Sequence, residues 1–369
     1  MIVLVVDALD ECTGDSDVEG LISLLAKAKE LESARLRIIL TSRPVYVVHL
    51  AFHDLPDIVH RDLILDDISR HIVDADIHLF FDHRFGVIRR NARGLPTSWP
   101  SEEDMDVLVH RAGGLFIYAA TTCRYVLEGS RFAEGRLDII LKASSGPDPA
   151  EKHLDEIYAA TLGQSVDGSY ESWEKENLYA MFREIAGSIA IFFEPSSTTT
   201  IIALLGKSEG DIESALGGLE SVLDHRADKQ WPIRLLHPSF RDFLLDHERC
   251  QDHNFQVNAE TTHGFLARQC LDRLLLLEAD MCGLGHLGIS QSEIDPQHVS
   301  QHITPELQYA CLYWVRHLEG SVSRSAEAKV VAFLEMHFLH WLEALSLIGK
   351  IGEAVQIITH LKALTVSGV

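Results

Sequence analysis

Three acidic side chains, Asp7, Asp10 and Glu11, follow directly on the apolar run from Met1 to Val6. A short, continuous apolar run that ends in acids is typical of a buried parallel strand that delivers side chains to a site at its carboxyl end. Clustered carboxylates at such a position suit a hard cation such as Mg²⁺, and one of them can orient a water molecule for phosphoryl transfer. The same residues also fit a core strand that leads into an acidic, solvated turn.

A second candidate group, Arg43, follows another apolar run, Leu36 to Leu40. Between the two runs, residues 18–31 carry valine, leucine and alanine at helical spacing. A strand, a helix and a second strand at this separation predict a right-handed βαβ unit whose loops share one edge of the sheet. Arg43 is therefore expected at the same edge as Asp7, where a guanidinium suits a γ-phosphate. Taken singly, an Arg-Pro pair after a strand is also common in surface turns.

Two glycines, Gly113 and Gly114, interrupt a helical pattern that runs from about Glu103 to Val126. Because a mid-helix glycine costs about 1 kcal/mol relative to alanine, the pair predicts a junction between helices or a close backbone approach.

Upstream of this pattern, the apolar triplet Leu63-Ile64-Leu65 predicts one further short strand.

Composition predicts where the α/β part ends. The stretch from Lys142 to Lys152 is rich in serine, glycine and proline and is typical of a linker, which predicts a first domain over residues 1–142. Two short helical segments and a strand then follow in the layout of a winged helix, within a second domain over residues 151–257. Residues 258–369 predict an all-helical third domain. The predicted fold class is α/β, with a partial parallel sheet, followed by a mostly α-helical region with a winged-helix unit.

Charge and composition exclude several kinds of partner. The formal net charge of −23 argues against direct contact with nucleic acid or with an acidic membrane surface. The six cysteines form no C-x-x-C pair, as expected of free thiols in a reducing compartment. No apolar run approaches ~20 residues, and the N-terminus has no signal-peptide pattern, so a cytoplasmic protein without a membrane span is expected.

In their order along the chain, these segments resemble the fungal NACHT proteins, a group of STAND-class P-loop NTPases. D-A-L-D-E, which ends at Glu11, resembles the Walker B segment, and L-T-S-R-P, which contains Arg43, resembles the sensor 1 element. L-H-P-S-F-R-D-F-L, which contains His237, resembles the H-x-S-F-x-x-F-L element of the winged helix in that group. The resemblance implies that the predicted sheet is part of a P-loop NTPase core.

The resemblance also implies roles for the acids and the arginine. Asp7 and Asp10 would order Mg²⁺, Glu11 would act as the catalytic residue that orients water, and Arg43 would sense the γ-phosphate of ATP. In the full-length family the cofactors are ATP or ADP together with Mg²⁺. These assignments identify one side of a nucleotide site.

Further contacts are implied by the glycines and the histidine. Gly113 and Gly114 would lie near the nucleotide base, although Leu115 stands where the family has proline. His237 would donate a ring N–H to the β-phosphate of ADP and hold the closed state. A buried histidine that bonds only to backbone is the alternative interpretation for His237.

One family element is missing. The phosphate loop, G-x-x-x-x-G-K-[ST], does not occur in this sequence. The triplet Gly206-Lys207-Ser208 has no glycine five positions earlier and is predicted to close a helix. Most contacts to nucleotide phosphates come from that loop, so this chain is not expected to hydrolyse nucleotide unaided.

Two functions remain open at this level. The first is a piece of a nucleotide-switched signalling protein of the kind involved in self/non-self recognition and immunity-like responses. The second is a non-catalytic interaction module that pairs with full-length NACHT partners, or with copies of itself, through its helical half. A winged-helix transcription factor is disfavoured because the winged segment has no basic recognition helix.

Overall fold

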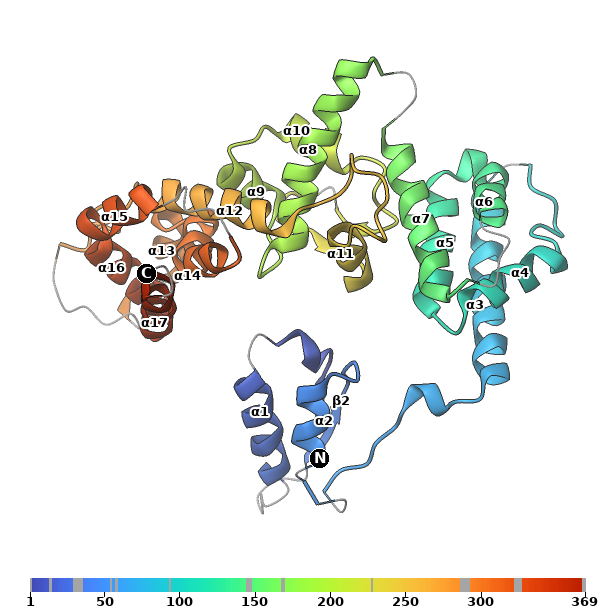
Figure 1. Ribbon diagram of the computed structural model, residues 1–369, viewed down its shortest axis with the longest axis horizontal. Helices are drawn as coiled ribbons and strands as arrows, with labels where there is room; N and C mark the ends of the chain where they lie inside the picture. Colours follow the sequence, from blue (N-terminus) through green and yellow to red (C-terminus); the bar gives the residue numbers. More distant parts are fainter. Residues whose placement is uncertain are drawn as a thin grey trace. The chain divides into compact units, whose positions relative to one another are not determined.

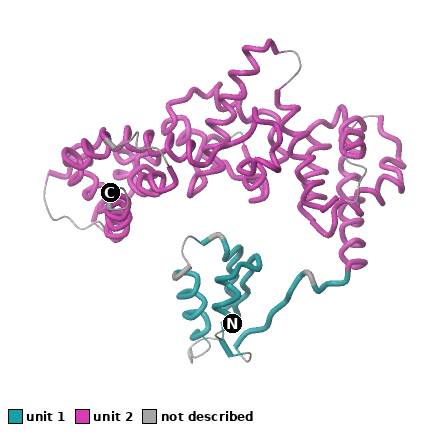
Figure 2. The backbone as a smooth tube through the Cα atoms, in the orientation of Figure 1, with its two compact units in different colours: residues 1–69 teal, residues 70–369 magenta. Residues whose placement is uncertain are grey.

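The chain, whose structure is a computed structural model, divides into two units, residues 1–69 and residues 70–369 (Figures 1 and 2). The structure describes residues 2–12, 15–28, 36–53, 55–56, 59–92, 94–143, 148–166, 170–226, 228–285, 293–321 and 327–366. Each unit has its own hydrophobic core. The domain boundaries predicted after residues 142 and 257 lie inside the second unit, and they stay predictions. The predicted linker falls partly on residues 144–147, outside the described residues.

In the first unit, a helix connects two strands that pair in parallel. β1 (Ile2–Val6) pairs with β2 (Leu36–Leu40) in parallel, with Val6 opposite Leu40. α1 (Asp15–Lys27) lies between them in sequence, and α2 (Tyr46–His53) follows β2. The predicted strand–helix–strand order and the predicted parallel pairing are therefore confirmed. The core of this unit contains the buried residues Leu9, Val18, Ile22 and Val48.

β1 is apolar along its whole length, yet it lies open to solvent. Its side chains Ile2, Val3 and Val5 are 58%, 51% and 60% exposed. Strands of parallel sheets are normally covered on both faces, which is why their sequences are continuously apolar. Within the described part of the first unit, β1 pairs with β2 alone. Its other edge and much of its side-chain surface are therefore uncovered in this unit.

The sheet of the α/β part has fewer strands than predicted. Leu63-Ile64-Leu65 was expected to form a strand, and this prediction is wrong. Leu65 opens a short 3₁₀ helix, η3 (Leu65–Asp67), and Leu63 is 81% exposed. The triplet is flanked by charged residues and has no pairing strand, so its apolar side chains find no cover. Among the described residues the sheets are two-stranded, β1–β2 and β3–β4, and helices make up most of the structure.

The second unit begins with a group of helices whose bounds are α3 (Arg70–Asn91), α4 (Glu102–Ala112), α5 (Phe116–Glu128), the 3₁₀ helix η4 (Ser130–Phe132), α6 (Ala133–Lys142) and α7 (Ala150–Ser165). α4 starts at a capping box, in which Ser101 and Asp104 each accept the other's backbone N–H. It ends at Gly113 in the left-handed region. The predicted junction at Gly113 and Gly114 is confirmed, since α5 begins at Phe116.

The next elements are α8 (Ser172–Ile191), α9 (Thr198–Leu205), α10 (Glu209–Leu216), β3 (Leu223–Asp224), β4 (Arg234–Leu235) and α11 (Pro238–Leu245). β3 and β4 pair antiparallel, and an isolated bridge joins Ser197 to Pro232. Gly206 caps the C-terminus of α9, as predicted, while Ser208 caps the N-terminus of α10. The triplet Gly206-Lys207-Ser208 is therefore a helix–helix turn.

The last helices are α12 (Ala259–Leu274), α13 (Pro296–His302), α14 (Pro305–Glu319), α15 (Glu327–Met336), α16 (Phe338–Leu347) and α17 (Glu353–Val366). α12 packs along α14. An edge-to-face cluster of Trp314, Phe333 and Trp341 fills the core between α14, α15 and α16, with ring centroids 5.1 to 6.3 Å apart. Both tryptophans are only 1% exposed, so they pack within the core.

No single helix among the described residues has the length and apolar composition needed to cross a membrane. The segments Ala328–Met336 and Phe338–Leu347 meet that requirement only when taken together, and a bend of 72° separates them.

Candidate functional site

The loops that follow β1 and β2 are hydrogen-bonded to each other. The Thr41 N–H donates to the Val6 carbonyl (3.0 Å), and the Leu9 N–H donates to the Thr41 carbonyl (2.9 Å). Between these bonds Ala8 takes a left-handed backbone conformation, with φ of 55°. A non-glycine residue pays a conformational cost in this region, so the flanking bonds hold the loop beyond β1 in a defined shape.

Asp7 lies at the tip of β1, as predicted, and its carboxylate is held by the hydroxyl of Thr41. That hydroxyl donates to Asp7 Oδ1 and accepts a 3.0 Å bond from the Ala8 N–H. One side chain therefore orients the carboxylate and satisfies a loop N–H. Sequence reasoning missed Thr41; the signal was its position directly after β2, level with Asp7 in the parallel register.

Asp10 and Arg43, predicted as a magnesium ligand and a phosphate sensor, are paired with each other. The Arg43 N–H donates to Asp10 Oδ1 at 2.9 Å, and Arg43 Nε lies 3.5 Å from Asp10 Oδ2. The side chain of Asp10 is 9% exposed and that of Arg43 is 50% exposed. The expectation that both groups share one edge of the sheet is confirmed. Asp10 thus acts as an anchor for Arg43, and its role as a metal ligand stays a prediction.

Glu11, the predicted catalytic residue, has its backbone in the 3₁₀ helix η1 (Leu9–Glu11), directly after the tip of β1. Its side chain lies outside the described residues. Within the described ranges, no group of three or more His, Cys, Asp or Glu side chains converges in a way that would hold a metal ion. Asp7 and Asp10 offer oxygen ligands of the kind that Mg²⁺ accepts, and Mg²⁺ commonly uses one or two carboxylates together with substrate phosphates.

Replacing Thr41 with valine is expected to destabilise the first unit by about 1 kcal/mol. Valine has a similar shape but leaves the Ala8 N–H without its acceptor and Asp7 without its donor. Urea unfolding of the chain measures the loss, and Thr41→Ser, which keeps the hydroxyl, is the control. Equal stability of the valine and serine variants would contradict this account of the loop.

In the second unit, close packing explains the two glycines. Gly113 has φ of 58° and Gly114 has φ of 87°. A Cβ at Gly113 would lie 2.3 Å from the Cβ of Ala150 at the start of α7. The Gly113 carbonyl also accepts a 2.6 Å bond from Arg70 Nη1. The junction therefore joins the first turns of α3 and α7, and its predicted contact with a nucleotide base stays a prediction.

His237 is the N-cap of α11. Its Nδ1 accepts from the Ser239 N–H (3.1 Å) and lies 2.7 Å from Ser239 Oγ. Since Nδ1 serves as the acceptor, the proton of the neutral ring is assigned to Nε2. This is the tautomer that an Nε2–H donor to a phosphate would need. The predicted phosphate contact itself stays a prediction.

α7 connects the glycine junction with the histidine. Its first residue, Ala150, packs on Gly113, and Tyr158 Oη lies 2.7 Å from Ser239 Oγ, two residues after His237. Ala150 and Tyr158 are separated by about 12 Å along the helix axis at 1.5 Å per residue. The glycine junction and the residues beside His237 thus both contact one helix.

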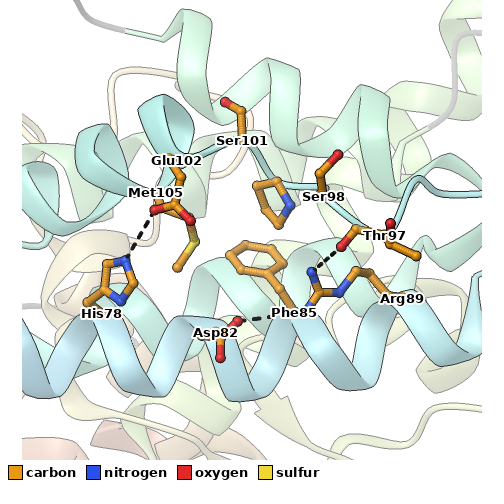
Figure 3. Close-up of a pocket in the computed structure, with 10 residues that line it drawn as sticks. His78, Asp82, Phe85, Arg89, Thr97, Ser98, Ser101, Glu102 and Met105 are labelled. Atoms are coloured by element: carbon orange, nitrogen blue, oxygen red, sulfur yellow. Dashed lines mark hydrogen bonds and ion pairs between the residues drawn. The ribbon is translucent and has the colours of Figure 1, made fainter.

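A separate cavity of about 360 Å³ opens where the segment before α4 crosses α3 (Figure 3). Phe85 and Met105 give it an apolar floor. His78 Nε2 lies 4.0 Å from Glu102 Oε2, and Arg89 Nη2 lies 3.7 Å from Asp82 Oδ1 (Figure 3). None of the residues predicted from the sequence as site residues lines this cavity.

Two comparisons with known proteins bear on these sites. Residues 1–43 match the family described as Nephrocystin 3, N-terminal, and this segment covers both strands and ends at Arg43. The vegetative incompatibility protein HET-E-1 of Podospora anserina is 21% identical over 396 aligned residues, which include 99% of this chain. Together they support a distant relationship to NACHT-type proteins. The chain spans 27% of the length of HET-E-1.

The similarity to this NACHT-type protein runs across both structural units, whereas the family match is confined to the first. The matched segment holds the strand tips with Asp7, Asp10 and Arg43. The shared sequence therefore includes the part of the first unit in which the predicted site residues meet.

Proposed function

We propose that this chain is part of a nucleotide-switched signalling protein of the NACHT/STAND class. In this proposal the first unit supplies the magnesium and γ-phosphate side of the nucleotide site, and the second unit supplies the helical and winged-helix regions that respond to it. Asp7 orders Mg²⁺, Glu11 orients the attacking water, and Arg43 senses the γ-phosphate. The class of nucleotide is ATP with Mg²⁺.

The observation that carries the proposal is the meeting of Asp7, Asp10 and Arg43 at the carboxyl ends of two adjacent parallel strands. In open parallel sheets, ligands bind beyond this edge. The loop after β1 carries a carboxylate oriented by Thr41, and the loop after β2 carries a half-exposed guanidinium held by Asp10. That combination suits a metal-bound triphosphate, which offers a cation to the carboxylate and anionic oxygens to the guanidinium.

The exposure of β1 is a further support. A two-stranded parallel sheet is too small to bury a continuously apolar strand. In the proposal β1 is a central strand of a larger sheet, paired on its other edge as well. Because the phosphate loop is absent from this sequence, nucleotide turnover is expected only where that loop is supplied.

The order of elements from α8 to β4 supports a winged-helix unit. The bridge at Ser197, the helices α9 and α10, and the antiparallel pair β3–β4 follow one another as in that fold. His237 stands two residues after β4, with its Nε2 assigned as the protonated nitrogen. In the proposal it donates to the β-phosphate of ADP in the resting state.

The relative's name suggests the cellular setting. HET-E-1 is described as a vegetative incompatibility protein. By that similarity we assign this chain to self/non-self signalling in the cytoplasm, with protein partners that include copies of itself. The C-terminal helical region, residues 258–369, is the proposed contact region for those partners.

The test is nucleotide binding by the chain itself. With one side of the site present, MgATP is expected to bind with a Kd on the order of 1 mM, or about −4 kcal/mol. Arg43→Ala is expected to weaken MgATP binding, and His237→Ala is expected to weaken ADP binding. NMR titration or equilibrium dialysis measures both. Arg37→Ala, an exposed arginine on β2 away from the strand tips, is the control.

Two outcomes would count against the proposal. One is the absence of any MgATP binding at saturating nucleotide. The other is binding that Arg43→Ala and Arg37→Ala weaken equally, because a general loss of positive charge would then explain the effect.

The exposed strand also favours a second candidate function, a non-catalytic module that pairs with a NACHT protein carrying its own phosphate loop. In that case β1 would be covered by the partner and ATP would be irrelevant to the pairing. A Val5→Lys variant is expected to abolish the complex in light scattering, whereas Arg43→Ala leaves it intact. Dependence of the complex on MgATP would favour the first function.

A further inference from the structure

The carboxylate of Asp10 is already occupied by groups of the loop after β2. Its Oδ1 accepts from the Arg43 N–H (2.9 Å) and from the Ser42 hydroxyl (3.3 Å), and its Oδ2 lies 3.5 Å from Arg43 Nε. The side chain of Asp10 is only 9% exposed. Each oxygen of this carboxylate therefore has a partner in the same loop.

This occupancy separates Asp10 from Asp7. Asp7 is exposed at the tip of β1, and its Oδ1 accepts from the Thr41 hydroxyl. An exposed carboxylate oriented in this way can bind a cation together with substrate phosphates. A cation at Asp10 would instead lie beside the positive guanidinium of Arg43, which repels it. The surroundings of Asp10 thus suit a guanidinium better than Mg²⁺.

The guanidinium of Arg43 can change its partner while the loop stays in place. Its side chain is 50% exposed, and the 3.5 Å separation from Asp10 is longer than the usual charge-assisted hydrogen bond of about 2.7–2.9 Å. Exposed ion pairs of this kind are weak. The backbone N–H of Arg43 is held to Asp10 separately, so the side chain can turn toward another anion without loss of that bond.

We infer that Asp10 holds Arg43 in a resting ion pair, which the γ-phosphate of ATP must displace. This inference rests on the proposed function and adds a regulatory step to it. Asp10 is then a positioning residue for Arg43 instead of a magnesium ligand. A nucleoside triphosphate breaks the pair because a phosphate group can accept two parallel hydrogen bonds from the guanidinium. A diphosphate has no γ-phosphate and leaves the pair intact.

Competition by Asp10 lowers the apparent affinity for ATP, because only molecules with a released guanidinium can bind the γ-phosphate fully. The pair therefore sets how strongly the chain prefers ATP over ADP. Removing the negative charge of Asp10 is expected to strengthen ATP binding, whereas loss of a magnesium ligand would weaken it. The two roles of Asp10 predict effects of opposite sign.

The experiment measures the Kd of MgATP and of MgADP for the full chain by equilibrium dialysis. Asp10→Asn keeps an oxygen for the Arg43 N–H and the Ser42 hydroxyl but removes the charge. It is expected to bind MgATP about two- to fivefold more tightly than the unmodified chain and to bind MgADP equally well. Asp67→Asn removes the same charge from an exposed position in η3 and is the matched control.

A double variant tests whether the gain acts through Arg43. Asp10→Asn combined with Arg43→Ala is expected to bind MgATP no more tightly than Arg43→Ala alone, because the released group is then missing. A gain that persists without the guanidinium, or an equal gain in Asp67→Asn, would overturn the inference, since a general loss of negative charge would explain it.

The remaining outcomes separate this inference from the proposed function. If Asp10→Asn weakens MgATP, or leaves the ratio of the two Kd values unchanged, the resting pair is refuted. The proposed function still stands in that case, provided that MgATP binding depends on Arg43. If neither nucleotide binds to the unmodified chain, the proposed function fails and the inference fails with it.

Discussion

A Gly113→Ala variant is expected to lose about 2–4 kcal/mol of stability in the second unit, whereas Gly206→Ala loses about 1 kcal/mol. Both glycines cap helices in the left-handed region, with φ of 58° and 65°, so an added Cβ meets similar backbone strain at each. Only at Gly113 would the Cβ also lie 2.3 Å from the Cβ of Ala150. At Gly206 nothing lies within 4 Å. Chemical denaturation, read by far-UV circular dichroism, measures both losses.

A double substitution locates the cause of the larger loss. Adding Ala150→Gly to Gly113→Ala removes the clashing methyl group, so the pair is expected to recover most of the difference from Gly206→Ala. Equal losses in Gly113→Ala and Gly206→Ala would instead mean that the start of α7 moves away without cost. The contact between α7 and the glycine junction would then not hold α7 in place.

Acid is expected to weaken the second unit through two histidines between α12 and α14. His263 Nδ1 lies 2.9 Å from His317 Nδ1, and Tyr309 Oη lies 2.9 Å from His317 Nε2. Tyr309 Oη also accepts from the Phe193 N–H (3.4 Å). All these contacts are satisfied when both rings are neutral, with Tyr309 donating to His317 and His317 donating to His263.

The surroundings oppose protonation of either ring. Burial, followed by the charges of Arg241 and Arg316, lowers the pKa of His263. Burial, followed by His263 and Arg316, lowers the pKa of His317 well below its ordinary value. The unfolded chain binds these protons at a pKa of about 6.5, whereas the folded chain binds them only at lower pH. Stability is therefore fully present above about pH 6.5 and falls below it, by up to about 1.4 kcal/mol per pH unit for each histidine.

Urea unfolding between about pH 7.5 and about pH 5.5 tests this expectation. His317→Gln removes one titrating ring but keeps an amide that can bond to Tyr309. Its stability is expected to fall less steeply with acid than that of the unmodified chain, and the difference between the two slopes isolates the contribution of His317. Parallel slopes would show that carboxylates alone set the acid sensitivity.

Local patterns predicted the elements that hold the candidate site. The apolar runs Ile2–Val6 and Leu36–Leu40 form strands, and the acids and the arginine after them meet at one edge because parallel strands end on the same side. The glycines at the α4–α5 junction were recognised from the cost of glycine within a helix. In each case the signal lies within a few residues of the feature.

The failures concern contacts between distant segments. The role of Thr41 depends on the register of β1 against β2, which no local pattern reveals. Leu63-Ile64-Leu65 has the composition of a strand but finds no partner strand. The pairing of Asp10 with Arg43 was foreseen as proximity but not as an ion pair.

The open strand β1 also bears on the fate of the free chain. Its sequence, Ile2–Val6, carries no charge and no proline, and its side chains and second edge are uncovered within the first unit. An apolar strand edge of this kind is a template for pairing with other chains and for cross-β aggregation. Molecules whose β1 is not covered by a partner segment would therefore tend to self-assemble through this strand. The concentration of free chain that stays unaggregated is then set by the concentration of the partner that covers β1.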